Sequence, residues 1–195
     1  MNGENRENST TEKQVKKGVK NGVRSAKECA YLAAFVALLI AAQLAFSFVP
    51  GAEIVTVLFA AYALAMGARR AMIAATAFSL LRCFIFGFFA TVLLLYVIYF
   101  NLLALCFGLI GRKWQADIKT LPFLIGIACF CTVCFTMLDN VITPLWYGYS
   151  AQAANAYFLA SLPFLVPQTV CVAVSVAFLL LPLNKAFLLV KKRLF

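Results

Sequence analysis

A few polar side chains interrupt the long apolar segments of this chain, and they are the residues most able to bind a ligand. Arg82 is the most informative, because a guanidinium in apolar surroundings is costly unless it faces the protein interior, pairs with an anion or contacts water. It follows Arg70 by 12 positions, which is roughly 18 Å along a helix. The residue could form a structural ion pair or bind an anionic group of a ligand.

Other polar residues extend this pattern. Glu53 follows the turn Pro50-Gly51-Ala52 and could pair with Arg82, bind a donor group of a ligand, or be an ordinary interface charge. Asn101 lies within an apolar run, where an uncompensated amide is costly, so it either bonds to a neighbouring helix or faces a cavity. We predict that a group of polar and aromatic residues converges on one ligand cavity. Its members are Glu53, Arg82, Tyr96, Tyr99, Asn101, Asp139, Asn140 and Trp146.

The sequence contains no pattern typical of catalysis. Histidine is absent, and there are no paired carboxylates in the apolar segments, no Gly-x-Ser-x-Gly motif and no phosphate-binding loop. The cluster Cys129-x-Cys131-x-x-Cys134 suggests a metal site, but positions 129 and 131 would lie about 200° apart around a helix. We predict that the cysteines pack as small apolar residues, and that the protein is not an enzyme and binds no metal or cofactor.

The composition predicts the elements that position these residues. The 195-residue chain is 64% hydrophobic and only 12% charged, with a mean hydropathy of +0.93, so we expect an all-α membrane protein. Six apolar segments approach the roughly 20 residues that a spanning helix needs, although the second is short, and a turn at Gly87 separates the third from the fourth. They are residues 29–48, 53–67, 71–88, 91–110, 121–139 and 158–182.

The basic residues predict the orientation. With six spans and an inner N-terminus, 16 of the 17 Lys and Arg residues fall on the cytoplasmic side, and only Arg82 lies within a span. The net charge of +10 is therefore a topology signal, and we predict no nucleic-acid partner. We expect residues 1–27 to be a basic cytoplasmic segment that is disordered or interfacial, and residues 28–195 to form the membrane domain.

Two further segments allow alternative interpretations. Residues 139–157 read as a long outer loop, whose aromatics could mark the headgroup belt or form a lid over a site. Ala33, Ala37 and Ala41 form a ridge of small residues on the first span, extended by Ala30, Ala34 and Ala45. Such a ridge lets another helix approach closely. It could serve internal packing or the docking of a separate membrane subunit.

Taken together, these features resemble the substrate-binding S component of an energy-coupling factor (ECF) vitamin transporter, over most of residues 29–190. The resemblance is carried by the small size, the six spans with both ends inside, the ridge Ala33-x-x-x-Ala37-x-x-x-Ala41, the run from Pro50 to Thr56, Gly67-Ala68-Arg69-Arg70, and the stretch from Ser79 to Phe88.

The resemblance implies that the chain captures a vitamin or related micronutrient at the outer face of a prokaryotic plasma membrane. It also implies that the ridge meets a transmembrane T component, which two cytoplasmic ATPases drive, and that the S component topples to release its vitamin inside. The alternatives are a non-transport membrane scaffold or assembly protein, in which the polar residues bond helices together, and a stand-alone carrier of small solutes.

Overall fold

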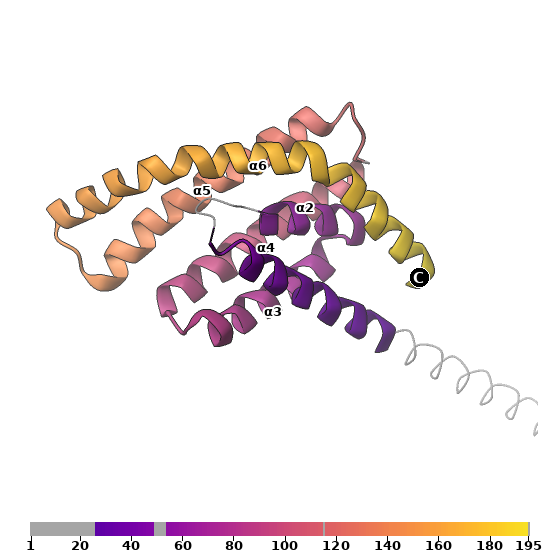
Figure 1. The fold of residues 1–195 in the computed structure, drawn as a ribbon, viewed down its shortest axis with the longest axis horizontal. Coiled ribbons are helices and arrows are strands. Elements are labelled where there is room, and N and C mark those ends of the chain that lie inside the picture. The colour runs from indigo at the N-terminus through magenta and orange to yellow at the C-terminus, as the bar shows by residue number, and fades with distance from the viewer. Residues whose placement is uncertain (1–25, 49–53, 115, 195) are drawn as a thin grey trace, which may run out of the picture.

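The computed structural model describes residues 26–48, 54–114 and 116–194, and within these ranges all regular structure is helical. An N-terminal helix, Ala26–Ala45, precedes five further helices (Figure 1). These are α2 (Ile54–Met66), α3 (Ala68–Phe86), α4 (Ala90–Lys113), α5 (Leu121–Tyr147) and α6 (Ala151–Leu194).

Glycines mark the sharp turns between these helices. Gly67 has a φ of 88° between α2 and α3, Gly87 has a φ of 99° after α3, and Gly148 has a φ of 62° after α5. Side chains with a Cβ rarely adopt positive φ, so glycine suits each position. The predicted turn at Gly87 is confirmed, because α3 ends at Phe86 and α4 begins at Ala90.

Helix α2 is the centre of the molecule. Every residue from Val55 to Met66 is buried, and α2 packs against α3, α4 and α6. A helix that is apolar on all sides gains most by burying all of them. Its 13 residues span only about 20 Å, in agreement with the short second apolar segment of the sequence.

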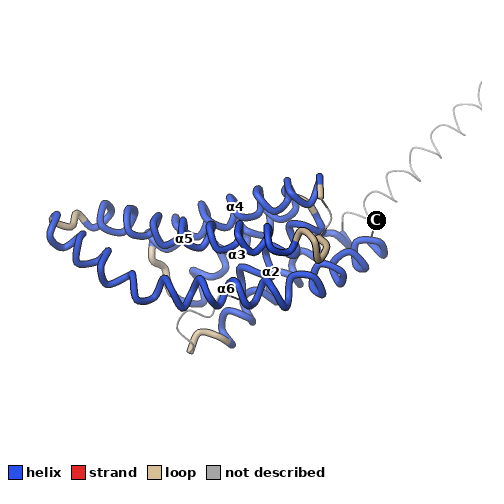
Figure 2. The backbone as a smooth tube through the Cα atoms, turned by 90° about the horizontal axis from the view of Figure 1, so that it is seen from above, coloured by secondary structure: helices blue, strands red, loops and turns tan. Residues whose placement is uncertain are grey.

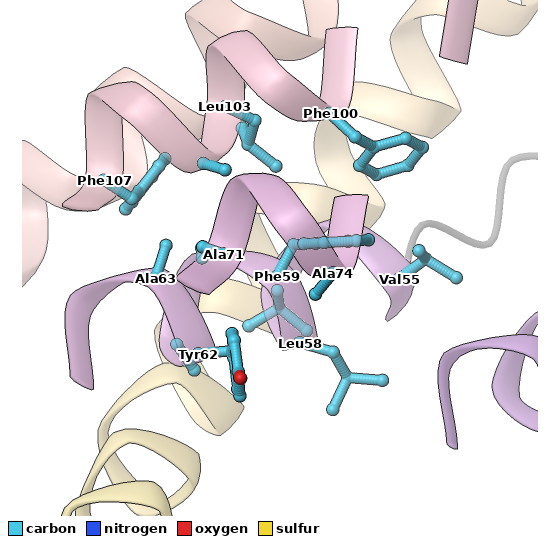
Figure 3. Close-up of a cluster of buried hydrophobic side chains, with 14 of the residues drawn as sticks. Val55, Leu58, Phe59, Tyr62, Ala63, Ala71, Ala74, Phe100, Leu103 and Phe107 are labelled. Carbon is cyan, nitrogen blue, oxygen red and sulfur yellow. The ribbon is translucent and has the colours of Figure 1, made fainter. Parts of the chain in front are cut away.

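Aromatic rings from the surrounding helices pack around α2, and those of Phe100 and Phe107 on α4 are labelled in Figure 3. Phe35 of the N-terminal helix stacks on Tyr62 of α2, with ring centroids 3.8 Å apart, and meets Phe187 of α6 edge to face at 5.6 Å. On the other side, Phe59 of α2 contacts Phe100 of α4, with ring centroids 4.7 Å apart. Contacts of this kind fix the positions of the helices that carry the polar residues.

The described helices are those of a helical membrane protein. Four of them are long and apolar enough to cross a membrane, namely the N-terminal helix, α4, α5 and α6. Helix α2 is shorter, and α3 carries three arginines within 19 residues. These two segments, both predicted as spans from the sequence, therefore differ from ordinary spanning helices.

The prediction of a long outer loop from Asp139 to Tyr157 is wrong. Helix α5 continues to Tyr147 and α6 begins at Ala151, so the connection is only Gly148–Ser150. Asp139 and Asn140 lie inside α5 and do not end it, because their side chains bond to other side chains of the hairpin and leave the helical backbone intact. Helix α6 also extends well beyond the predicted 158–182, at both ends.

The α5–α6 hairpin is therefore longer than the sequence indicated. In two perpendicular views its closed end projects beyond α3 and α4 (Figure 1, Figure 2). Near its other end, α6 packs against α2 and bends (Figure 1). Pro182 lies inside this helix, and a proline removes one backbone hydrogen bond and kinks the helix.

Candidate functional site

Arg82 lies where α3 faces the start of α4. Its guanidinium carbon is 4.1 Å from the centroid of the Tyr96 ring on α4 and 5.1 Å from that of Phe86, one turn further along α3. The faces of aromatic rings attract cations, and the attraction grows when water is excluded. Arg82 and Tyr96, both predicted site residues, are thus brought together by the antiparallel packing of α3 and α4.

Part of the Arg82 guanidinium has unused hydrogen-bonding capacity. Its buried Nε has no hydrogen-bond partner among the described residues, and no carboxylate of those residues forms an ion pair with Arg82. A buried donor without an acceptor costs about 1–3 kcal/mol. An anionic or carbonyl group of a ligand could supply the acceptor.

Gln43 joins this group from the N-terminal helix. Its Nε2 donates a hydrogen bond of 3.3 Å to the Tyr96 hydroxyl, while its buried Oε1 has no partner in the described part of the chain. Gln43 was not among the site residues predicted from the sequence. The available signal was that Gln43 is the only amide in the first apolar run. We define Gln43, Arg82, Phe86 and Tyr96 as the arginine–tyrosine cluster.

Asn101 bonds α4 to α3. Its Nδ2 donates to the Thr76 hydroxyl of α3 at 3.2 Å and to the backbone carbonyl of Val97 at 2.8 Å. Of the two alternatives for this residue, bonding to a neighbouring helix is the one observed. Asn101 lies more than one turn along α4 from Tyr96, and it stabilises the α3–α4 pair that carries the cluster.

Asp139 and Asn140 belong to the α5–α6 hairpin. The Asp139 carboxylate accepts hydrogen bonds from Thr143 at 2.7 Å and from the Tyr157 hydroxyl at 2.8 Å, while the Asn140 amide donates to the Ser161 hydroxyl at 2.9 Å. Polar atoms of these two side chains therefore bond to α6. The Asn140 Oδ1 is buried without a hydrogen-bond partner in the described residues, as are Arg82 Nε and Gln43 Oε1 of the arginine–tyrosine cluster.

The remaining predicted site residues do not join either group through described contacts. Trp146 lies near the end of α5 with 58% of its surface exposed. Tyr99 packs against Phe135 with ring centroids 4.6 Å apart. Glu53 and the Pro50–Glu53 turn lie outside the described residues, so the pairing of Glu53 with Arg82 stays a prediction.

The alanine ridge lies on the outside of the molecule. Ala33, Ala37 and Ala41 are exposed, whereas Phe35, which points away from the ridge on the same helix, and Val36 beside the ridge are buried. These three residues are therefore not buried against the described helices. The ridge forms one wall of an apolar groove of about 470 Å³, and Ala77, Leu81 and Ile85 of α3 form the other.

Comparison with family models, curated proteins and solved structures found no match to this chain.

Proposed function

We propose that this chain is the substrate-binding S component of an ECF-type importer, with six spans and both ends in the cytoplasm of a prokaryotic cell. It captures a vitamin or related micronutrient at the outer face of the plasma membrane. It then delivers this ligand inward together with a T component and two ATPase subunits.

The exposed alanine ridge is the observation that carries this proposal. A helix that packs within its own chain usually turns its small residues inward, where they allow close approach. Here Phe35 and Val36 face the core, while Ala33, Ala37 and Ala41 face outward beside an apolar groove. This arrangement favours close contact with a helix of another membrane subunit.

The arginine–tyrosine cluster supports the ligand-binding part of the proposal. It combines a cation, an amide and two rings, which suit a flat molecule that carries a carboxylate or phosphate. Two of its buried polar atoms, Arg82 Nε and Gln43 Oε1, have unused hydrogen-bonding capacity among the described residues. A ligand that satisfied both atoms would recover their desolvation cost.

Docking can be tested with a bulky residue in the ridge. Ala37→Trp should abolish co-purification with coexpressed T component and ATPases, because an indole prevents close helix approach, while the thermal unfolding temperature should change little. Ala160→Trp, at an exposed alanine of α6, is the matched control and should leave the complex intact. Equal loss in both variants, or unfolding of Ala37→Trp alone, would contradict the docking role.

Ligand binding can be tested on the purified chain with a panel of water-soluble vitamins and their precursors. One member should raise the unfolding temperature of the wild-type protein and bind with nanomolar affinity. Arg82→Gln should weaken that binding by tenfold or more, since a charge-assisted hydrogen bond contributes about 1.5–3 kcal/mol. Absence of binding across the panel, with no associated ATPase module, would refute the proposed function.

A second candidate is a membrane scaffold or assembly protein. The observation in its favour is that Asn101, Asp139 and Asn140 are bonded to neighbouring helices, as expected of residues that only hold helices together. On this view, Arg82→Gln and Ala37→Trp would mainly lower stability, and no vitamin would bind.

A further inference from the structure

A basic cavity lies at the end of the molecule opposite the closed end of the α5–α6 hairpin. Its volume is about 820 Å³, and its walls come from the α2–α3 turn, the last turns of α4 and the end of α6, together with Glu28 of the N-terminal helix. Four cationic side chains line it, against the single carboxylate of Glu28. They are Arg69, Arg70, Arg112 and Lys191.

Two glycines of α4 build this cavity by allowing close backbone contact. A Cβ on Gly108 would lie 2.3 Å from the Ala68 backbone nitrogen, and a Cβ on Gly111 would lie 2.4 Å from the Leu64 carbonyl oxygen. Only glycine permits this approach without movement of the backbone. The contact brings the end of α4, with Arg112, against the start of α3, with Arg69 and Arg70.

Two of the four cations are already bonded to the protein. Lys191 Nζ donates to the Ala65 carbonyl oxygen at 2.7 Å, where it satisfies an acceptor at the C-terminal end of α2. Arg70 forms an ion pair with Glu28 at 3.5 Å. The side chains of Arg69 and Arg112 are exposed, and no described carboxylate pairs with either.

The start of α3 adds to the positive potential of the cavity. Its N-cap residue is Gly67, no side chain caps the helix, and the first turn contains no acidic residue. The dipole of a helix favours an anion near its N-terminus. Arg69 and Arg70 lie in this first turn, so their charges and the dipole act on the same part of the cavity.

One wall of the cavity is apolar and continues onto the outer surface. Ile73 of α3 and Leu109 of α4 line the cavity and remain 53% and 52% exposed. Phosphate in solution would gain nothing from these side chains, whereas the acyl chains of a lipid could lie against them. The combination of clustered cations and an adjoining apolar surface therefore fits an amphiphilic anion.

We propose that this cavity binds the phosphate headgroup of an anionic phospholipid of the inner leaflet, with Arg69 and Arg112 as the main contacts. Lys191 and Arg70 shape the cavity through their bonds to Ala65 and Glu28. The inference does not depend on the proposed transport function, because it concerns a different end of the molecule.

The test uses the full chain purified in mild detergent and native mass spectrometry after addition of phosphatidylglycerol, phosphatidylcholine or inorganic phosphate. Phosphatidylglycerol should be retained and phosphatidylcholine should not. The double variant R69Q/R112Q should bind phosphatidylglycerol about 30-fold more weakly, from about 1 kcal/mol for each removed cation. The matched control K192Q/R193Q removes the same charge from exposed positions outside the cavity and should bind as the wild type does.

Each alternative result has a defined meaning. Equal retention of both lipids, or equal losses in the two double variants, would overturn the proposal. Displacement of bound phosphatidylglycerol by millimolar inorganic phosphate alone would assign the site to free phosphate. If R69Q/R112Q bound lipid normally but lost a co-purifying protein, the cations would belong to an acidic protein partner. The thermal unfolding temperature of both variants shows whether either has failed to fold.

Discussion

At the scale of single residues, the main feature of the candidate site is the cation–π contact between Arg82 and Tyr96. The guanidinium lies over the ring at 4.1 Å, and the ring is itself held by Phe100 and Phe135, at centroid distances of 5.3 and 5.9 Å. A cation in this position is stabilised even without a carboxylate. This arrangement leaves Arg82 able to bind a ligand without first breaking an ion pair to a described residue.

A double-mutant cycle tests this contact. Tyr96→Leu should lower the free energy of unfolding by about 2 kcal/mol more than Tyr96→Phe, because leucine removes the ring while phenylalanine removes only the hydroxyl. In an Arg82→Met background the penalty of Tyr96→Leu should shrink by about 1–2 kcal/mol. Unfolding in detergent, followed by circular dichroism, measures both values. Equal penalties in the two backgrounds would show that the cation and the ring are not coupled.

Part of this site could be predicted from the sequence, and the reason is local geometry. Arg82 and Phe86 are four positions apart, so a helix places them on one face, and a lone arginine in an apolar run indicates a special environment. Gln43 and Tyr96 are 53 positions apart, and only the packed structure shows their bond. Asn101 looked equivalent to Arg82 in the sequence because the partner that satisfies it, Thr76, lies on another helix.

At the scale of helices, the packing of α4 against the α2–α3 turn depends on two glycines. Gly108 and Gly111 both face backbone atoms at distances that exclude a side chain, whereas a Cβ on Gly126 of α5 would meet nothing within 4 Å. The three residues are all helical glycines in apolar segments. Their sequence context alone does not separate the two that hold helices together from the one that does not.

We expect Gly111→Ala to destabilise the protein by about 1–3 kcal/mol, the usual cost of adding a methyl group to a filled space. Gly126→Ala should be neutral or stabilising, because alanine favours the helix and nothing obstructs it. Thermal unfolding of the two variants side by side measures the difference. A stable Gly111→Ala protein would mean that α4 can move away from Leu64 at little cost.

The sequence predicted the helix end at which a glycine adopts a positive φ. It failed where long-range side-chain hydrogen bonds determine whether a helix continues. Gly87 ends α3 as expected, because its positive φ suits no other residue. Asp139 and Asn140 looked like the end of a span, since such residues commonly lie at helix ends and in turns. Their bonding partners on α6, Tyr157 and Ser161, follow 18 and 21 positions later, and that long-range contact is invisible in a local pattern.

At the scale of the whole molecule, basic residues from separate segments gather at one end. Arg69 and Arg70 at the start of α3, Arg112 at the end of α4 and Lys191 near the end of α6 all line the same cavity. The closed end of the α5–α6 hairpin, at Gly148, lies away from this group (Figure 1). The positive-inside rule then predicts that the basic end faces the cytoplasm and Gly148 faces outward.

Reporter fusions test this orientation. Green fluorescent protein fused to the C-terminus should fluoresce, and alkaline phosphatase inserted after Gly148 should be active, because each reporter works only on its own side of the membrane. Alkaline phosphatase inserted after Lys119, in the connection between α4 and α5, is the matched control and should be inactive. The reverse pattern of activities would invert the topology and place the basic cavity outside.

The length of α6 has a consequence for the bilayer around it. Its 44 residues correspond to about 66 Å, whereas hydrocarbon core and headgroups together measure about 40–45 Å. A straight helix of that length would lie within this thickness only at a tilt of about 50°, which is beyond the range common for spanning helices. The bend of α6 (Figure 1), or extension of one end into the surrounding water, reduces the tilt that is needed. We therefore expect the tilt and bend of α6, and with them the behaviour of the protein, to depend on the acyl-chain length of the surrounding lipid.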